Sequence, residues 1–258
     1  MYPKLLENKD NCFSPNYYPL PNKITIFAHI IAKLHIQLMA SIKAILFDLD
    51  GTLLDTIEDL TASTNYALRT FSLPERSIDE VRSFVGNGVR RLMQQAVPAN
   101  TDEELFEEIF AAFKDYYFKH SYDYTRPYQG IMPLLLKLKE NSILMGIVSN
   151  KWHTAVQELS QCFFSDLISV AIGESETTPR KPNPEGVFAA LKALGCKAEE
   201  TLYVGDSDID IMTAQNAGIP CISVTWGFRN EAFLKSHNAE ILIHSPQELL
   251  SIIEEKGC

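Results

Sequence analysis

Short apolar runs alternate with amphipathic stretches along the chain from Ala44 onward. This alternation is typical of strand–helix–strand units, in which buried parallel strands are continuous apolar runs. Six runs predict strands, at Ala44–Leu49, Ile143–Val148, Ile168–Ile172, Thr201–Val204, Cys221–Val224 and Glu240–Ile243. Helices are predicted near Pro133–Glu140, Thr154–Phe163, Pro184–Leu194, Ile209–Ala217 and Pro246–Glu254. The pattern therefore predicts an α/β fold around a parallel sheet.

One region interrupts this alternation, because residues 55 to about 127 contain no convincing strand. Apolar residues recur there at helical spacing, first over Ile57–Phe71. Capping-box signatures at Ser77–Glu80 and Thr101–Glu104 predict the starts of two further helices. Arg126-Pro127 marks the return to the sheet. An all-helical insert of about 70 residues is therefore expected after the first strand.

Residues 1–40 are expected to form an N-terminal extension. Their apolar stretch Ile24–Ala40 contains two histidines and a lysine, and it is too short and polar for a membrane-spanning helix of about 20 residues. A secretory signal is one alternative, since Lys23 precedes the apolar run. The plainer interpretation is that Met39 is the start. If expressed, the extension is a weakly ordered tail or a loosely docked amphipathic helix.

The composition narrows the classes of partner. With 46% hydrophobic and 22% charged residues the chain is globular, and its net charge of −10 repels nucleic acid and anionic membranes. An anionic substrate must therefore be captured by a local positive site. Five widely spaced cysteines without a C-x-x-C pair indicate a reduced, cytoplasmic location. We expect no nucleic-acid or membrane partner.

Asp48 and Asp50 lie at the carboxyl end of the first predicted strand. Ligands of open parallel sheets bind at the carboxyl ends of the strands. Two carboxylates so close repel each other unless a cation, a shared proton or a substrate compensates. The pair therefore indicates a metal or acid–base site, against the alternative of a solvated turn closed by Gly51.

Three further polar groups follow later strands, where a parallel sheet brings them to the same edge. They are Ser149-Asn150-Lys151, Lys181 and the acidic segment Gly205–Asp210. Carboxylates suit Mg²⁺, whereas a hydroxyl group and an ammonium group suit phosphoryl oxygens. Each group has an ordinary structural explanation by itself, as a helix cap or a solvated charge. Their occurrence together in this order favours one site for a divalent cation and a phosphate.

Four segments resemble the motifs of the haloacid dehalogenase superfamily, in that family's order. They read F-D-L-D-G-T-L-L-D-T, S-N-K, P-R-K-P-N-P and G-D-S-D-I-D, and the resemblance covers about residues 42 to 250. It implies a Rossmann-like core over residues 41–55 and 128–258, with an inserted all-helical cap over residues 56–127. Phe84–Val89 and Val224–Gly227 most resemble the phosphoglycolate phosphatase branch.

The resemblance also implies roles for individual residues. Asp48 is the nucleophile that forms an aspartyl-phosphate, and Asp50 is the general acid and base. Mg²⁺ is held by Asp48, by the backbone carbonyl group of Asp50 and by Asp206. The remaining implied residues are the phosphate-binding Ser149, Asn150 and Lys181 and the supporting Thr52 and Asp210.

In the cap, the candidates for binding the part of the substrate beyond the phosphate are the loop Gly86-Asn87-Gly88 and Arg90. Two glycines allow backbone N–H groups to approach a substrate closely, and Arg90 is a counter-ion for a substrate carboxylate. Helix punctuation and a solvated surface charge are the alternatives.

The expected function is Mg²⁺-dependent hydrolysis of a small phosphomonoester, with phosphoglycolate as the first candidate. One alternative is a sugar phosphomutase of the β-phosphoglucomutase type, since the catalytic motifs do not separate the two. Others are a phosphatase of another small phosphate ester or sugar phosphate, and a non-catalytic binding protein. The expected state is a monomer or a homodimer.

Overall fold

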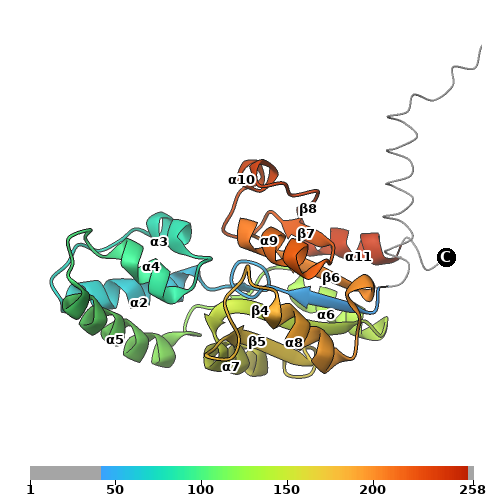
Figure 1. Ribbon diagram of the computed structural model, residues 1–258, viewed down its shortest axis with the longest axis horizontal. Coiled ribbons are helices and arrows are strands. Elements are labelled where there is room, and N and C mark those ends of the chain that lie inside the picture. Colours follow the sequence, from blue (N-terminus) through green and yellow to red (C-terminus); the bar gives the residue numbers. More distant parts are fainter. Residues whose placement is uncertain (1–41, 255–258) are drawn as a thin grey trace, which may run out of the picture. The chain divides into compact units, whose positions relative to one another are not determined.

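The computed structural model describes residues 42–254 of the 258-residue protein, so the expectations for residues 1–40 lie outside the described residues. Within this range six parallel strands form one sheet in the order β5-β4-β1-β6-β7-β8 (Figure 1). The strands are β1 (Ala44–Phe47), β4 (Leu144–Trp152), β5 (Val170–Glu174), β6 (Thr201–Gly205), β7 (Cys221–Val224) and β8 (Ile241–Ile243). All six predicted strands are present, which confirms the α/β fold.

Five of the six strands differ from their predicted bounds, and β4 and β5 differ most. β4 continues past Val148 to Trp152, because its last residues stay largely buried and Trp152 pairs with Glu174. β5 begins at Val170 instead of Ile168, because the backbone N–H group of Ile168 donates to Phe164 in the turn that ends the preceding helix. Both differences come from contacts between elements that periodicity does not report.

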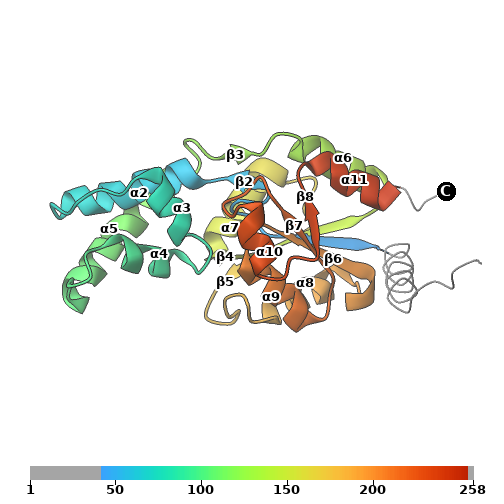
Figure 2. The same cartoon turned by 90° about the horizontal axis from the view of Figure 1, so that it is seen from above.

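Helices cover both faces of the sheet. Successive side chains of β1 point to opposite faces, so neighbouring residues of this strand pack against different helices. Ile45 and Phe47 share a buried cluster with residues of α6 (Ile131–Glu140), α7 (His153–Phe164) and α11 (Pro246–Glu254). Leu46 shares another with α8 (Glu185–Leu194) and α9 (Asp208–Ala217). Figure 2 shows α6 and α11 on one side of the sheet and α8 and α9 on the other. The predicted Rossmann-like core is confirmed.

Two short elements of the core were not predicted, η1 (Ala198–Glu200) and α10 (Glu231–Ser236). The strand order reverses beside β1, which pairs with β4 on one side and with β6 on the other. In open α/β sheets the crevice for ligands lies at such a reversal, outside the carboxyl ends of the strands.

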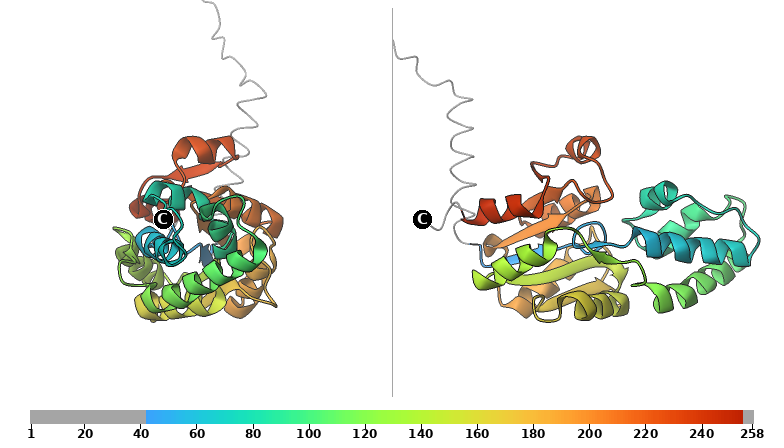
Figure 3. Two further views of the ribbon diagram at one scale, coloured as in Figure 1. Left: turned by 90° about the vertical axis from the view of Figure 1, so that its left-hand side faces the viewer. Right: turned by 180° about the vertical axis from the view of Figure 1, so that it is seen from behind.

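The insert is all helical between two very short strands. Its helices are α2 (Ile57–Thr70), α3 (Ile78–Phe84), α4 (Val89–Ala96) and α5 (Glu103–His120), seen together in Figure 3. They have their own buried cluster, which includes Leu68, Phe106 and Phe113. The expectation of no strand in this region is wrong at its two ends, because β2 (Leu54–Asp55) pairs with β3 (Arg126–Pro127). Two-residue strands are too short to give a period. The division between core and cap stays a prediction.

The two expected helix starts differ in outcome. Ser77 caps α3 as predicted: its hydroxyl oxygen accepts from the N–H group of Glu80, and the Glu80 carboxylate accepts from the N–H group of Ser77 at 2.8 Å. The start at Thr101 is wrong, because Asp102 caps α5 by accepting from Leu105 N at 2.9 Å. Thr101 and Asp102 are both suitable caps, and the structure uses the later one.

Among the helices of residues 42–254, none is long and apolar enough to cross a membrane.

Candidate active site

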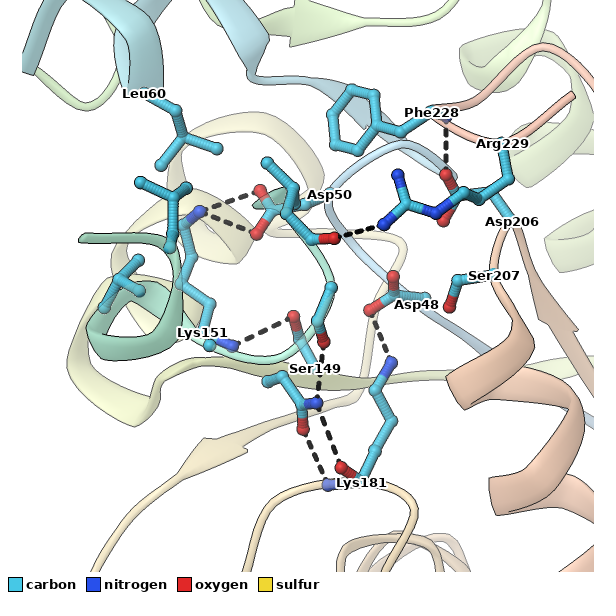
Figure 4. Close-up of a pocket in the computed structure, with 16 residues that line it drawn as sticks. Asp48, Asp50, Leu60, Ser149, Lys151, Lys181, Asp206, Ser207, Phe228 and Arg229 are labelled. Carbon is cyan, nitrogen blue, oxygen red and sulfur yellow. Dashed lines mark hydrogen bonds and ion pairs between the residues drawn. The ribbon is translucent and has the colours of Figure 1, made fainter. Parts of the chain in front are cut away.

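The predicted catalytic residues surround one small cavity of about 40 Å³ at the carboxyl ends of the strands (Figure 4). Its wall includes eight predicted site residues, namely Asp48, Asp50, Ser149, Asn150, Lys181, Asp206, Gly86 and Gly88. The other predicted residues, Thr52, Asp210, Asn87 and Arg90, do not line it. The helical insert adds Leu60, Val85, Val89 and Leu92 to the two glycines, so the insert and the sheet together line the cavity.

A tight turn places the two acids of the first motif. The N–H group of Asp48 still donates to β6, at 2.9 Å from Val204 O, and Gly51 N then closes the turn on Leu54 O at 2.9 Å. Gly51 has φ +88°, and a Cβ atom there would overlap the Asp206 carboxylate. Only glycine satisfies both conditions.

Lys181 lies between two carboxylates. Its Nζ atom is 2.7 Å from Asp48 Oδ1, 2.7 Å from Asp210 Oδ1 and 3.1 Å from the hydroxyl group of Tyr203. Burial acts to lower the pKa of Lys181, but Asp210 and Asp48 outweigh it and raise that pKa well above its usual value. The site therefore contains a permanent ammonium group.

The acids at the site outnumber this ammonium group. Asp48, Asp206 and Asp210 are buried, and their ligand oxygens lie within 4.8 Å of one another. Burial raises the pKa of Asp48 to about 7 against the opposing effect of Lys181. Burial also raises the pKa of Asp206, and the charges of Asp210 and Asp48 add to the rise. A hard divalent cation would neutralise this excess negative charge, so the cluster fits one.

Hydrogen bonds separate the three acids. Asp210 Oδ1 accepts from Lys181 and Tyr203, and Oδ2 accepts from the N–H group of Ser207 at 3.1 Å and its hydroxyl group at 2.6 Å. By contrast, Asp48 and Asp206 each keep one oxygen without a hydrogen bond to residues 42–254. This arrangement favours Asp48 and Asp206 as metal ligands and the predicted supporting role for Asp210.

Lys151 is a site residue that the sequence analysis quoted without a role. Its Nζ atom is 2.7 Å from both carboxylate oxygens of Asp50, and only 2% of the residue is exposed. Burial acts to lower its pKa, but Asp50 and Tyr117 raise it above the usual value. In the sequence, only its position directly after Ser149 and Asn150 indicated that Lys151 belongs to the site.

Asn150 holds two loops together. Its amide donates to Lys181 O at 3.1 Å and to Gly86 O at 2.9 Å, and its Oδ1 atom accepts from Lys181 N at 2.6 Å. These bonds favour a positioning role for Asn150 beside the predicted phosphate contact. Thr52 is fully buried, and its hydroxyl group has no hydrogen-bond partner among the described residues.

Arg90 has other partners than a substrate. Its guanidinium forms ion pairs with Glu103 at 3.1 Å and with Glu107, and it lies over the ring of Phe106. Together with Asn87 it lines a separate surface cavity. The structure therefore gives Arg90 partners within the insert, and its predicted contact with a substrate stays a prediction.

Trp226–Arg229, directly after β7, connects three parts of the site. Trp226 Nε1 donates to Thr52 O at 3.0 Å, and Phe228 N donates to Asp206 Oδ2 at 2.6 Å. Arg229 donates to main-chain oxygens of the insert. The predicted resemblance to the phosphoglycolate phosphatase branch covered Val224–Gly227 and did not include Phe228 or Arg229.

Gly227→Ala is expected to lower kcat/KM about 100-fold. A Cβ atom at Gly227 would overlap the main-chain oxygen of Gly51 and the Cβ atom of the Asp206 side chain, so the turn after β1 or Asp206 would have to move. A displacement of about 1 Å in such a site costs on the order of 10²-fold in rate. Steady-state kinetics of the purified variant measures this loss, and a thermal melt measures its stability.

The control is Gly195→Ala. Gly195 has a positive φ, a Cβ atom there meets nothing within 4 Å, and the residue ends α8 away from the cavity. This variant should lose about 1 kcal/mol of stability and keep its kcat/KM. Equal kinetics for both variants would contradict the role given to Gly227.

Comparisons with known proteins agree with this geometry. Residues 45–224 match the family model of haloacid dehalogenase-like hydrolases. A phosphoglycolate phosphatase from Yersinia pestis is 34% identical over 79% of this chain and 90% of its own length. An N-acetylmuramic acid 6-phosphate phosphatase from Pseudomonas aeruginosa is 30% identical over 84% of this chain and 97% of its own.

A similar solved structure is that of a predicted phosphoglycolate phosphatase from Haemophilus somnus 129PT. It is 29% identical, with a TM-score of 0.77, over 83% of this chain and 99% of the other. These similarities confirm the predicted superfamily and its phosphoglycolate phosphatase-like branch. The predicted enzyme class, a phosphoric monoester hydrolase, is also the class that the relatives' names give. The chain belongs to the haloacid dehalogenase-like hydrolase family.

Proposed function

We propose that the protein hydrolyses a small phosphomonoester with Mg²⁺, through an aspartyl-phosphate on Asp48. The observation that carries this proposal is the ammonium group of Lys181 between Asp48 and Asp210, on the wall of a cavity that also contains Asp50 and Asp206. A phosphoryl group beside Asp48 would meet this cation and the hydroxyl group of Ser149. Phosphoryl transfer needs such positioning and charge stabilisation more than any other contribution from the protein.

Asp48 and Asp206 would hold Mg²⁺ through their free carboxylate oxygens, with the backbone carbonyl group of Asp50 as a further ligand. The bound cation would reduce the repulsion between the nucleophile and the anionic substrate. Asp210 contributes by fixing Lys181 and the start of α9, since its two oxygens bond to Lys181 and Ser207.

Asp50 is the proposed general acid and base. It would protonate the leaving alkoxide and then accept a proton from the water that hydrolyses the aspartyl-phosphate. Lys151 holds the Asp50 carboxylate by both oxygens, which fixes its direction on the cavity wall. Lys151 is therefore a positioning residue for this step.

Phosphoglycolate is the first substrate candidate, because relatives over most of the chain carry that name. The similar N-acetylmuramic acid 6-phosphate phosphatase makes a larger sugar phosphate the second. The mutase alternative, the cytoplasmic location and the monomeric or homodimeric state stay predictions.

A panel of phosphomonoesters tests the proposal. Purified protein with Mg²⁺ should release inorganic phosphate fastest from a small ester such as 2-phosphoglycolate. A sugar 1-phosphate is included, and its products are analysed for the sugar 6-phosphate. Formation of the 6-phosphate without free phosphate would favour the mutase, and release of no phosphate from any ester would contradict the proposed function.

A further inference from the structure

Three cationic side chains line the cavity, and they differ in their partners (Figure 4). Lys181 lies 2.7 Å from carboxylate oxygens of Asp48 and Asp210, and Lys151 lies 2.7 Å from both oxygens of Asp50. Arg229 has no carboxylate within 4.0 Å among residues 42–254. Its positive charge therefore has no direct counter-ion on the described chain.

The partners that Arg229 does have are neutral. Its guanidinium donates to the main-chain oxygens of Arg82 at 3.0 Å, Ser83 at 3.3 Å and Val85 at 2.6 Å. These bonds use three of the five N–H groups of an arginine and fix the plane of the guanidinium. They orient the group at the cavity wall without neutralising its charge.

The charge of Arg229 also acts on Asp206, a proposed metal ligand, without an ion pair. Burial raises the pKa of Asp206, and the guanidinium opposes that rise. The N–H group of Phe228 donates to Asp206 Oδ2 at 2.6 Å, so this oxygen already has a hydrogen-bond donor from the backbone beside Arg229. The charge of Arg229 thus stays available at the wall.

The side chains that the insert adds to the wall are all apolar. Leu60, Val85, Val89 and Leu92 line it, together with Phe228 from the core. A leaving group with a carboxylate would carry its charge into this apolar surface, where an unpaired ion is strongly unfavourable. Arg229 is the lining cation, within the described chain, that such a carboxylate would meet without displacing another carboxylate.

We propose that Arg229 selects phosphomonoesters whose leaving group carries a carboxylate, which it binds as a charged, hydrogen-bonded pair. The inference rests on the proposed function and names its class of substrate. The bonds to the insert use one N–H group of Nη1 and both of Nη2, so within the described chain the Nε–H group and the second N–H group of Nη1 remain free to donate to a carboxylate. A hydrogen bond between two charged groups is about twice as strong as one between neutral groups. Arg229 is thus a specificity-determining residue that the motifs do not include.

The experiment compares two substrates on two variants. The substrates are 2-phosphoglycolate and 2-hydroxyethyl phosphate, which replaces the carboxylate by a neutral hydroxymethyl group. Arg229→Gln removes the charge and keeps a donor, whereas Arg229→Lys keeps the charge and loses the planar set of N–H donors. For Arg229→Gln we expect kcat/KM to fall about 100-fold with 2-phosphoglycolate and less than about 3-fold with the neutral ester, as expected for one charged hydrogen-bonded pair. With 2-phosphoglycolate, kcat/KM of Arg229→Lys should lie between the values of wild type and Arg229→Gln.

Arg180→Gln is the matched control. Arg180 also donates to a main-chain oxygen of the insert, Asn87 O at 2.8 Å, but it pairs with Glu174 at 3.2 Å and does not line the cavity around Asp48. If the insert is merely fastened by arginines, both variants should lower kcat/KM equally on both substrates. A loss specific to Arg229 and to the carboxylate supports the proposal.

Other outcomes overturn it. If kcat/KM of Arg229→Gln falls equally on both substrates, Arg229 only holds the insert in place. If it falls on neither, Arg229 has no role in selecting the substrate. If wild type hydrolyses only neutral esters, this inference fails while the proposed function stands.

Should wild type hydrolyse no ester, binding decides the inference separately. Calorimetry then compares 3-phosphonopropionate with n-propylphosphonate on wild type and Arg229→Gln. A preference for the carboxylate that disappears in the variant supports the inference, and an unchanged preference or none overturns it.

Discussion

Asp48→Asn is expected to lower kcat at least about 10³-fold while the fold stays intact, because it removes the nucleophile of a covalent mechanism. Asparagine keeps the shape of the side chain, and Lys181 keeps the carboxylate of Asp210 as its partner at 2.7 Å. Loss of one negative charge from an excess of buried acids leaves no new unpaired carboxylate. Phosphate release and a thermal melt of the same preparation measure the two effects.

Asp166→Asn is the control for this substitution. Asp166 is exposed between α7 and β5 and does not line the cavity. It should leave both kcat and the melting temperature unchanged. Turnover above about 1% of wild type by folded Asp48→Asn protein would remove Asp48 from the role of nucleophile.

Removal of divalent metal is expected to abolish activity, and Mg²⁺ is expected to restore it. Asp48, Asp206 and Asp210 lie within 4.8 Å of one another with one ammonium group among them, and an anionic phosphate adds to the repulsion. Ca²⁺ should restore little activity, since it takes more ligands at longer distances than Mg²⁺ and loosens the geometry of transfer.

Stability gives a second measurement of metal binding that does not depend on turnover. Mg²⁺ at about 100 times its dissociation constant should stabilise wild type by about 2.7 kcal/mol. Asp206→Asn should lose most of this effect, because it removes a proposed ligand. Full activity in excess chelator, or equal stabilisation of both proteins, would exclude the proposed metal site.

The sequence determined where the catalytic groups meet. Asp48, Ser149 and Asp206 each lie at the carboxyl end of a predicted strand. Lys181 lies in the segment that follows another predicted strand. Parallel strands place their carboxyl ends at one edge, so adjacency along the chain becomes adjacency in space. The structure brings these four residues to one cavity, as this reasoning predicted. Their chemical roles stay predictions.

Local signals were less certain where two residues competed. Thr101 and Asp102 are both suitable helix caps, and the motif at Thr101 predicted the wrong one. The strands β2 and β3 were missed because each has two residues, and their pairing depends on the insert bringing its ends together. Patterns over a few residues do not contain that closure.

Only the tertiary structure decided which charges neutralise one another. Lys151 pairs with Asp50 across 101 positions of sequence, Lys181 pairs with Asp48 across 133, and Arg229 reaches Val85 across 144 and finds a neutral oxygen. The strand pattern gives the edge at which a residue lies, but not the direction of a side chain in a loop or the position of the insert over the sheet. A charge interacts with whatever lies within a few ångströms, so these partners depend on distances that exist only after the three hydrophobic clusters have packed.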